Sequence, residues 1–216
     1  MKSFLSFYCA VKNSIKIVHY LSVILKTIFS LRFYHFLLVK MYSGYQRYLF
    51  LRNLNKRFPN TIIADDIIIH NPELVKIGTD VIISPGCYLN CGYLPHLGNI
   101  SIGNGSIVGY NACLYAGGGK ITIENNVDLG INCVVSTQSR SLLQDPVQHR
   151  KNFEHTFGEI LIGEGTLVGS NVNILEGTVL GKYCNVISGA VVQGVYPDRT
   201  TLVGNPSRPL PRTNFN

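Results

Sequence analysis

The sequence predicts a mainly β chain that winds into stacked parallel coils behind a basic helical extension. Aliphatic residues recur every six positions over more than half of the chain, and 21 glycines without a tryptophan favour a turn-rich β structure. All twelve acidic residues follow position 64, whereas ten of the nineteen basic residues precede it. With 46% hydrophobic and 14% charged residues among 216, the composition excludes disorder and fits one domain with an appendage.

The segment from Lys2 to Val39 is predicted to form a basic amphipathic helix. Bulky aliphatic residues cover most of its surface, and its polar residues step by three or four positions along one face: Lys12, Lys16, His19, Ser22, Lys26 and Ser30. Charges interrupt every apolar run of 18 residues, which argues against a membrane-spanning helix, and no signal-peptide cleavage site follows. We therefore expect residues 1–64 to be an N-terminal extension of a cytoplasmic protein.

An apolar surface beside a lysine stripe leaves two partners open for this extension. Residues 1–40 suit the anionic inner face of a membrane, where each basic residue contributes roughly 1 kcal/mol. They suit equally the protein's own body or a sister subunit, with the lysines facing outward. Nucleic acid is not expected, because the basic residues alternate with bulky aliphatics and no recognition motif accompanies them.

Residues 65–212 are predicted to form a parallel β-helix of about five coils. Six residues make one short strand and one turn, three such units close a triangular coil, and coils stack at the strand-pairing distance of about 4.8 Å. Position five of the hexad is small or β-branched, as a tight corner requires. The aliphatic residues at position one are Ile77, Ile83, Leu89, Ile102, Val108, Leu114, Ile123, Leu129, Val135, Ile162, Val168, Ile174, Leu180, Val186 and Val192, with Leu202 as an outlier.

The cysteines follow the same register. Cys87, Cys133 and Cys184 occupy position five, and Cys113 follows one. Because no C-x-x-C pair and no Cys/His metal spacing is present, we expect small buried thiols in a reducing compartment rather than disulfides or zinc.

The repeat fails between Val135 and Ile162, where residues 139–159 must leave the coil as an excursion loop. After the last hexads, residues 204–208 read G-N-P-S-R, close to a G-N-P-A-[KR] signature. With these features the segment from Ile77 to about Arg208 resembles the hexapeptide-repeat acyltransferases, closest to the O-acetyltransferases of sugars and surface polysaccharides. The resemblance implies a left-handed β-helix, acetyl-CoA as co-substrate without a metal, and a bacterial homotrimer with active sites between neighbouring chains.

In that family, a histidine just before the loop is the general base, and its position here is Arg140. A guanidinium stays protonated at physiological pH, so Arg140 cannot take a proton from an acceptor. His155, or less readily His149, then becomes the candidate base in the loop, with Arg140 paired to Glu154 and positioning His155. The alternative interpretation of both histidines is a solvated loop side chain.

A second candidate base is His96. The run Leu94-Pro95-His96, followed by I-S-I-G at residues 100–103, resembles the serine-acetyltransferase branch, in which a histidine precedes such a hexad. A third possibility is that the chain keeps the scaffold without the reaction.

The resemblance also implies a groove for the acyl-CoA arm, walled by small residues whose backbone groups reach the pantetheine amides. The matching positions are Gly169, Ser170, Ser188, Gly189 and Ala190, and the turn at Asn205 with Arg208 would meet the nucleotide end, where a cation suits phosphate. Corner packing alone would also explain each small residue. We therefore expect transfer of an acyl group, acetyl in the first instance, to a sugar or glycan hydroxyl; an amine acceptor and a non-catalytic scaffold are the alternatives.

Overall fold

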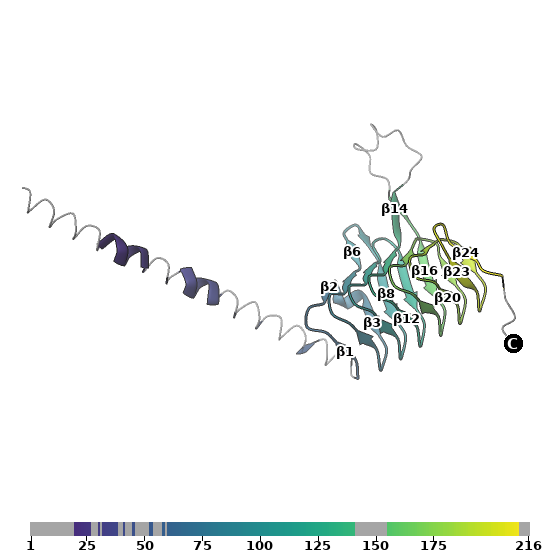
Figure 1. Cartoon of the computed structure of the whole chain (residues 1–216), viewed down its shortest axis with the longest axis horizontal. Coiled ribbons are helices and arrows are strands. Elements are labelled where there is room, and N and C mark those ends of the chain that lie inside the picture. The colour runs from purple at the N-terminus through teal and green to yellow at the C-terminus, as the bar shows by residue number, and fades with distance from the viewer. Residues whose placement is uncertain are drawn as a thin grey trace, which may run out of the picture. The chain divides into compact units, whose positions relative to one another are not determined.

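The computed structural model describes residues 20–26, 30, 32–38, 41, 45, 52–53, 58, 60–140 and 155–211. The chain divides into two compact units, Met1–Asn53 and Leu54–Asn216. In the first unit, residues 20–26 and 32–38 are helical. The second unit is a solenoid of parallel strands (Figure 1).

Three parallel sheets form the faces of the solenoid. Face A contains β1 (Ile62–Ile63), β4 (Ile82–Ile83), β9 (Ile107–Val108), β12 (Asp128–Leu129), β17 (Leu167–Val168), β20 (Asn185–Val186) and β23 (Thr201–Val203), with β24 (Arg208–Pro209) added antiparallel. Face B contains β2 (Ile68–His70), β5 (Tyr88–Asn90), β10 (Cys113–Tyr115), β13 (Val134–Ser136), β18 (Asn173–Ile174) and β21 (Val191–Val192). Face C contains β3 (Val75–Ile77), β8 (Asn99–Ile102), β11 (Lys120–Ile123), β16 (Glu159–Ile162), β19 (Val179–Leu180) and β22 (Val195–Tyr196).

The hexad periodicity explains this architecture. From Ile83 onward every position-one residue is buried, and the strand registers align these residues as inward ladders, such as Leu89–Leu114–Val135 on face B. Position-five residues, including Val81, are buried at the corners. The predicted fold class, a mainly β parallel β-helix behind a helical segment, is therefore confirmed.

The solenoid has about six turns, one more than the sequence pattern predicts. The additional turn is the first, made by β1, β2 and β3 with η1 (Pro72–Leu74), and it begins at Ile62, before the expected boundary at residue 65. Ile69 and Val75 are buried in this turn. The hexad pattern does not extend to β1 and β2, because its first position-one residue is Ile77 in β3.

The connections between faces stack into three edges. At the A–B edge, four-residue turns link face A to face B, at 109–112, 130–133, 169–172 and 187–190 among others. At the B–C edge, the chain leaves the coil twice. The first departure is the hairpin of β6 (Gly92–Tyr93) and β7 (His96–Leu97), and the second is flanked by the antiparallel pair β14 (Gln138–Arg140) and β15 (His155–Phe157). Both rise from the same side of the solenoid (Figure 1).

Candidate active site

The two candidate histidines of the solenoid meet at one side chain, Phe157. The ring centroids of His96 and Phe157 lie 4.8 Å apart with their planes inclined by 31°. The ring centroids of His155 and Phe157 are 6.1 Å apart. The sequence presented these histidines as separate alternatives, but the structure brings them to one site on the B–C edge.

A glycine explains how Phe157 comes so close to the coil. A Cβ built on Gly118 would lie 2.3 Å from Cδ1 of Phe157, and Gly118 has a φ of +67°. The N–H of Gly118 also donates to the carbonyl of His96 at 3.0 Å. The β6–β7 hairpin and the β14–β15 pair therefore both pack on the backbone at Gly118.

His155 is held at its Nδ1 by the side-chain amide of Gln138, the residue two positions before Arg140. In the β14–β15 pair, Arg140 lies opposite His155 and Gln138 opposite Phe157. An amide offers Nδ1 either its N–H₂ or, after a half-turn, its oxygen. As the side chains lie, the amide nitrogen of Gln138 faces Nδ1 of His155; with the amide turned so that its oxygen faces Nδ1–H, the Nε2 lone pair of His155 would be free to accept a proton. Glu154 and His149, the other loop residues of interest, lie outside the described residues.

The residues expected to wall the cofactor groove lie at the A–B edge, in successive coils. Ser188 Oγ accepts a hydrogen bond from the N–H of Ser170 at 3.1 Å, and the N–H of Gly189 donates to the carbonyl of Ser170 at 2.9 Å. Gly169 packs directly on Ser188, where a Cβ would lie 2.6 Å from its backbone nitrogen. Ser188 and Gly189 are exposed, whereas the Ala190 side chain is fully buried and points into the core.

The G-N-P-S-R turn continues this edge into the last coil. The N–H of Val191 donates to the carbonyl of Gly204 at 3.0 Å, and the N–H of Ser207 donates to the carbonyl of Val191 at 2.8 Å. Asn205 is exposed, and so is Arg208, which lies opposite Val203 in the β23–β24 pair. The A–B edge thus presents backbone groups, two serines and the exposed Arg208, whereas His96 and His155 lie at the B–C edge.

Sequence reasoning missed a cluster of aromatic and amide side chains at the B–C edge. The His70 ring lies 5.5 Å from that of Tyr88 and 5.9 Å from that of Tyr93, between centroids. Asn90 Nδ2 donates to the Tyr88 hydroxyl at 2.7 Å. The available signal was the irregular spacing of thirteen residues between Leu89 and Ile102, which marks an insertion after a face B strand just as the longer excursion does.

Solved structures provide the comparison with known proteins. AntD, an N-acyltransferase from Bacillus cereus in complex with dTDP and 3-hydroxybutyryl-CoA, matches with a TM-score of 0.64 and 22% identity over 74% of this chain and 86% of AntD. VCA0836, a hexapeptide-repeat-containing acetyltransferase from Vibrio cholerae O1 biovar eltor complexed with acetyl-CoA, matches with a TM-score of 0.55 and 27% identity over 65% and 72%. The chain has the fold of the hexapeptide-repeat acyltransferases. A scan against protein-family models and a search of curated proteins find no match.

An AntD variant extends the comparison to a sugar nucleotide. It was crystallised with dTDP-4-amino-4,6-dideoxyglucose and coenzyme A, and it matches with a TM-score of 0.62 and 22% identity over 70% of this chain and 79% of that one. The hexapeptide-repeat fold thus occurs, among these neighbours, in enzymes crystallised with coenzyme A or its acyl esters.

The described cysteines of this hexapeptide-repeat solenoid are free, and four of the five are buried. Burial raises the pKa of Cys87 and of Cys91 to about 11, and it also raises the pKa values of Cys113, Cys133 and Cys184. These thiols stay protonated near neutral pH and are poor nucleophiles. Within the described ranges, no three His, Cys, Asp or Glu side chains are grouped to hold a metal ion. Cys9 lies outside those ranges.

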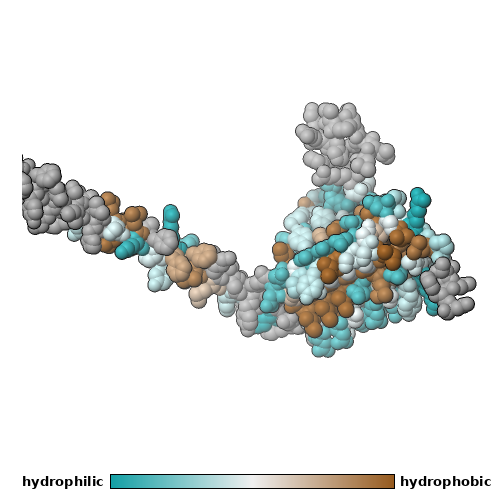
Figure 2. All heavy atoms as spheres, viewed as in Figure 1, coloured by the Kyte–Doolittle hydropathy of each residue, from teal (hydrophilic) through white to brown (hydrophobic). Residues whose placement is uncertain are grey.

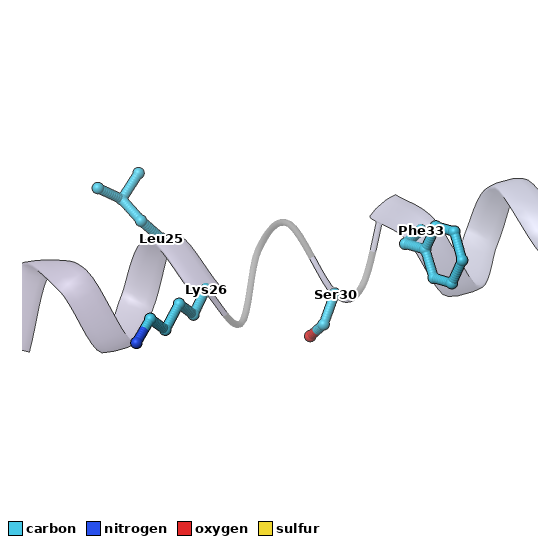
Figure 3. Close-up of a pocket in the computed structure, with 4 residues that line it drawn as sticks. All are labelled: Leu25, Lys26, Ser30 and Phe33. Carbon is cyan, nitrogen blue, oxygen red and sulfur yellow. The ribbon is translucent and has the colours of Figure 1, made fainter.

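The N-terminal unit carries a shallow hollow bordered by Leu25, Lys26, Ser30 and Phe33. Leu25 points away from Lys26 and Ser30, so the side chains do not converge on a common point (Figure 3). Hydrophobic side chains are exposed along the helical residues of this unit (Figure 2). None of the described helical stretches is both long enough and apolar enough to cross a bilayer.

Proposed function

We propose that this protein transfers an acyl group, acetyl in the first instance, from acyl-CoA to a hydroxyl of a sugar or a surface-polysaccharide precursor. The observation that carries the proposal is the convergence of His96 and His155 on Phe157, at the edge where the chain leaves the solenoid. Support also comes from the fold, which AntD and VCA0836 share and in which both were crystallised with a coenzyme A species.

The reaction requires a base that releases its proton again. The imidazole of His155 takes the acceptor's hydroxyl proton as the oxygen attacks the thioester carbonyl, and the imidazolium returns the proton to the departing thiolate of coenzyme A. This role requires the half-turned orientation of the Gln138 amide, in which its oxygen faces Nδ1–H and the Nε2 lone pair of His155 is left for the acceptor. His96, whose ring also packs against Phe157, would orient the acceptor.

Acetyl-CoA binding is the direct test of the cofactor role of the A–B edge. Gly169, Ser170, Ser188 and Gly189 would meet the pantetheine arm, and Arg208 would meet a phosphate. Calorimetry should find acetyl-CoA binding that weakens about tenfold in Arg208→Ala, the loss expected for one exposed charged contact. Arg199→Ala removes another exposed arginine of the last coil and should leave the affinity unchanged. If neither acetyl-CoA nor longer acyl-CoAs bind, the non-catalytic scaffold replaces this proposal.

The acceptor atom can be identified from the product. An O-acetyl ester is cleaved by alkaline hydroxylamine, whereas an N-acetyl amide survives it. Incubation with radiolabelled acetyl-CoA and matched sugars bearing a hydroxyl or an amine at the same carbon should give a hydroxylamine-labile product. A resistant product would assign the chain to N-acyl transfer, the activity of AntD.

The two edges support assembly of the site from two chains of a homotrimer. The histidines lie at the B–C edge and the proposed cofactor wall at the A–B edge, so the two groups occupy different corners of the triangular coil. A cyclic trimer brings one patch of each chain against a different patch of the next. Co-expressed His155→Ala and Arg208→Ala chains should then recover about one active site in four, although each variant alone is impaired. No recovery in the mixture would place both groups in one chain's site.

The extension supports binding to the anionic inner face of a membrane through residues 1–40. Leu21, Ile24 and Phe33 are exposed on helical residues, and no acidic residue accompanies the basic ones before Asp65. Reversing two charges in Lys26→Glu/Arg32→Glu should weaken binding to phosphatidylserine vesicles by at least tenfold, because each basic residue contributes about 1 kcal/mol. Lys76→Glu on face C is the matched control and should bind as the wild type does. Equal binding by all three proteins would refute the membrane assignment.

A further inference from the structure

A strip of aromatic rings follows the B–C edge from the first coil to the excursion. Tyr88 and Tyr93 both contact the His70 ring, with centroid distances of 5.5 and 5.9 Å. In the β6–β7 hairpin, Tyr93 lies directly opposite His96, and paired residues of an antiparallel hairpin project their side chains to the same side. His96 then reaches Phe157, so the strip connects the tyrosines to the proposed base.

The strip is fixed from beneath by a buried amide. Asn90 is 1% exposed, and its Nδ2 donates to the hydroxyls of Tyr88 at 2.7 Å and Tyr93 at 3.4 Å. Its Oδ1 accepts the N–H of Gly92 at 2.7 Å, which ties the start of the hairpin to the same amide. Asn71 Nδ2 adds a hydrogen bond to the carbonyl of Gly92 at 2.7 Å. Because both phenol oxygens accept from Asn90, their positions are set before any ligand arrives.

The tyrosines combine an open ring face with hydroxyls held close to it. Tyr93 is 59% exposed, and Leu94 at the hairpin tip is also exposed. Burial raises the pKa of Tyr88 above its ordinary value, and the Tyr93 hydroxyl raises it further, so Tyr88 is uncharged at neutral pH. A flat apolar face with nearby hydroxyls matches a pyranose ring, which has an apolar C–H face and hydroxyls around its rim.

We infer that Tyr93, with Tyr88 and His70, is the surface on which the pyranose ring of the acceptor stacks, beside the histidines that would activate it. The inference rests on the proposed function, since the ring it binds is that of the acceptor. Nothing in this arrangement depends on the A–B edge, so a defect here should change acceptor binding and leave acyl-CoA binding intact.

Steady-state kinetics test the surface in the active enzyme. Tyr93→Leu keeps an apolar residue but removes the ring, and it should raise KM for the sugar about tenfold with kcat and the KM for acetyl-CoA nearly unchanged. Tyr93→Phe keeps the ring and should stay close to the wild type. Tyr110→Leu, at the A–B edge, removes a tyrosine of similar exposure, 52%, and serves as the control. An unchanged sugar KM in Tyr93→Leu would overturn the inference.

A tryptophan reporter tests the same surface without catalysis. The chain contains no tryptophan, so Tyr93→Trp introduces a single one, and Tyr110→Trp is its control. Methyl glycosides of glucose, galactose and N-acetylglucosamine should give a saturable fluorescence change in Tyr93→Trp alone. That change in a protein without transferase activity would support the surface and refute the proposed reaction. Full transferase activity with no change would do the reverse, and a response to dTDP but to no glycoside would make this a nucleotide site and overturn the inference.

Discussion

The A–B and B–C edges of the solenoid are made by the same coils but solve different problems. At the A–B edge, short turns repeat with little variation, and Asn111, Asn132 and Asn171 form a ladder of side-chain amides with hydrogen bonds of 3.3 Å between neighbours. At the B–C edge the chain departs twice, and the Phe157 ring packs over Gly118 and contacts the rings of His96 and His155. The regular turns stabilise the stack of coils. The two excursions carry large side chains, such as histidine and phenylalanine, for which the tight corner of a hexad has no space.

The largest effect is expected from removing the base at the B–C edge. His155→Ala should lower kcat by a factor of about 10² to 10⁴, the usual contribution of a general base, with the dissociation constant of acetyl-CoA unchanged. His35→Ala removes an exposed histidine of the N-terminal unit and should have no effect. His96→Ala should cost less than His155→Ala. A larger fall in kcat for His96→Ala than for His155→Ala, measured in a fixed-time acetyl-transfer assay, would make His96 the base.

A second substitution separates the steric effect on Phe157 from the strain of placing an alanine at a positive φ. Gly118 and Gly177 both lie at the B–C edge, with φ of +67° and +76°, so an alanine at either position is disfavoured by about 1 kcal/mol. A Cβ at Gly118 meets the Phe157 ring, whereas one at Gly177 has nothing within 4 Å. We expect kcat/KM to fall at least tenfold in Gly118→Ala only, with similar urea midpoints for both. Equal activity in the two variants would show that Phe157 does not position the histidines.

The sequence predicted the solenoid because its core is periodic. A buried aliphatic residue such as Leu114 recurs every six positions within each run of hexads. The site is not periodic. His96 and His155 were found singly, from motif and loop, but their meeting depends on Phe157 and on coil stacking. Both insertions follow a face B strand, after Asn90 and after Ser136. Their position at one common edge could therefore have been predicted from the sequence. The ring contacts were not, because they depend on how each hairpin bends over the coil.

The asparagine ladder gives the converse test at the A–B edge. Asn132 and Asn126 share a φ of 56°, but only Asn132 belongs to the ladder, with its amide bonded to Asn111 and to Asn171. Asn132→Ala should therefore reduce the free energy of unfolding by about 1–2 kcal/mol more than Asn126→Ala, since two amide hydrogen bonds are lost. Transferase activity should persist in both variants. A loss of activity without a loss of stability would give this edge a direct part in the chemistry.

The smallest expected effect is on the pH dependence of stability at alkaline pH, for which one buried thiol at each edge is compared. Cys87 closes a turn of the A–B edge and Cys91 begins the β6 hairpin, and burial raises the pKa of each from 9.0 to about 11. Below pH 9 both the folded and unfolded forms keep the proton, so the stability contribution is fully present. Between pH 9 and 11 the unfolded chain releases the proton first, and folding loses about 1 kcal/mol per thiol at pH 10.

Urea midpoints at pH 8 and pH 10 measure this loss. Cys87→Ala and Cys91→Ala should each reduce the fall between the two pH values by a similar amount, whatever constant packing loss each substitution adds. A reduction in Cys87→Ala alone would show that the Cys91 thiol already meets water in the folded protein. The β6 hairpin would then open at its base, and the Asn90 clamp beneath the aromatic strip would be less rigid than the A–B edge it is compared with.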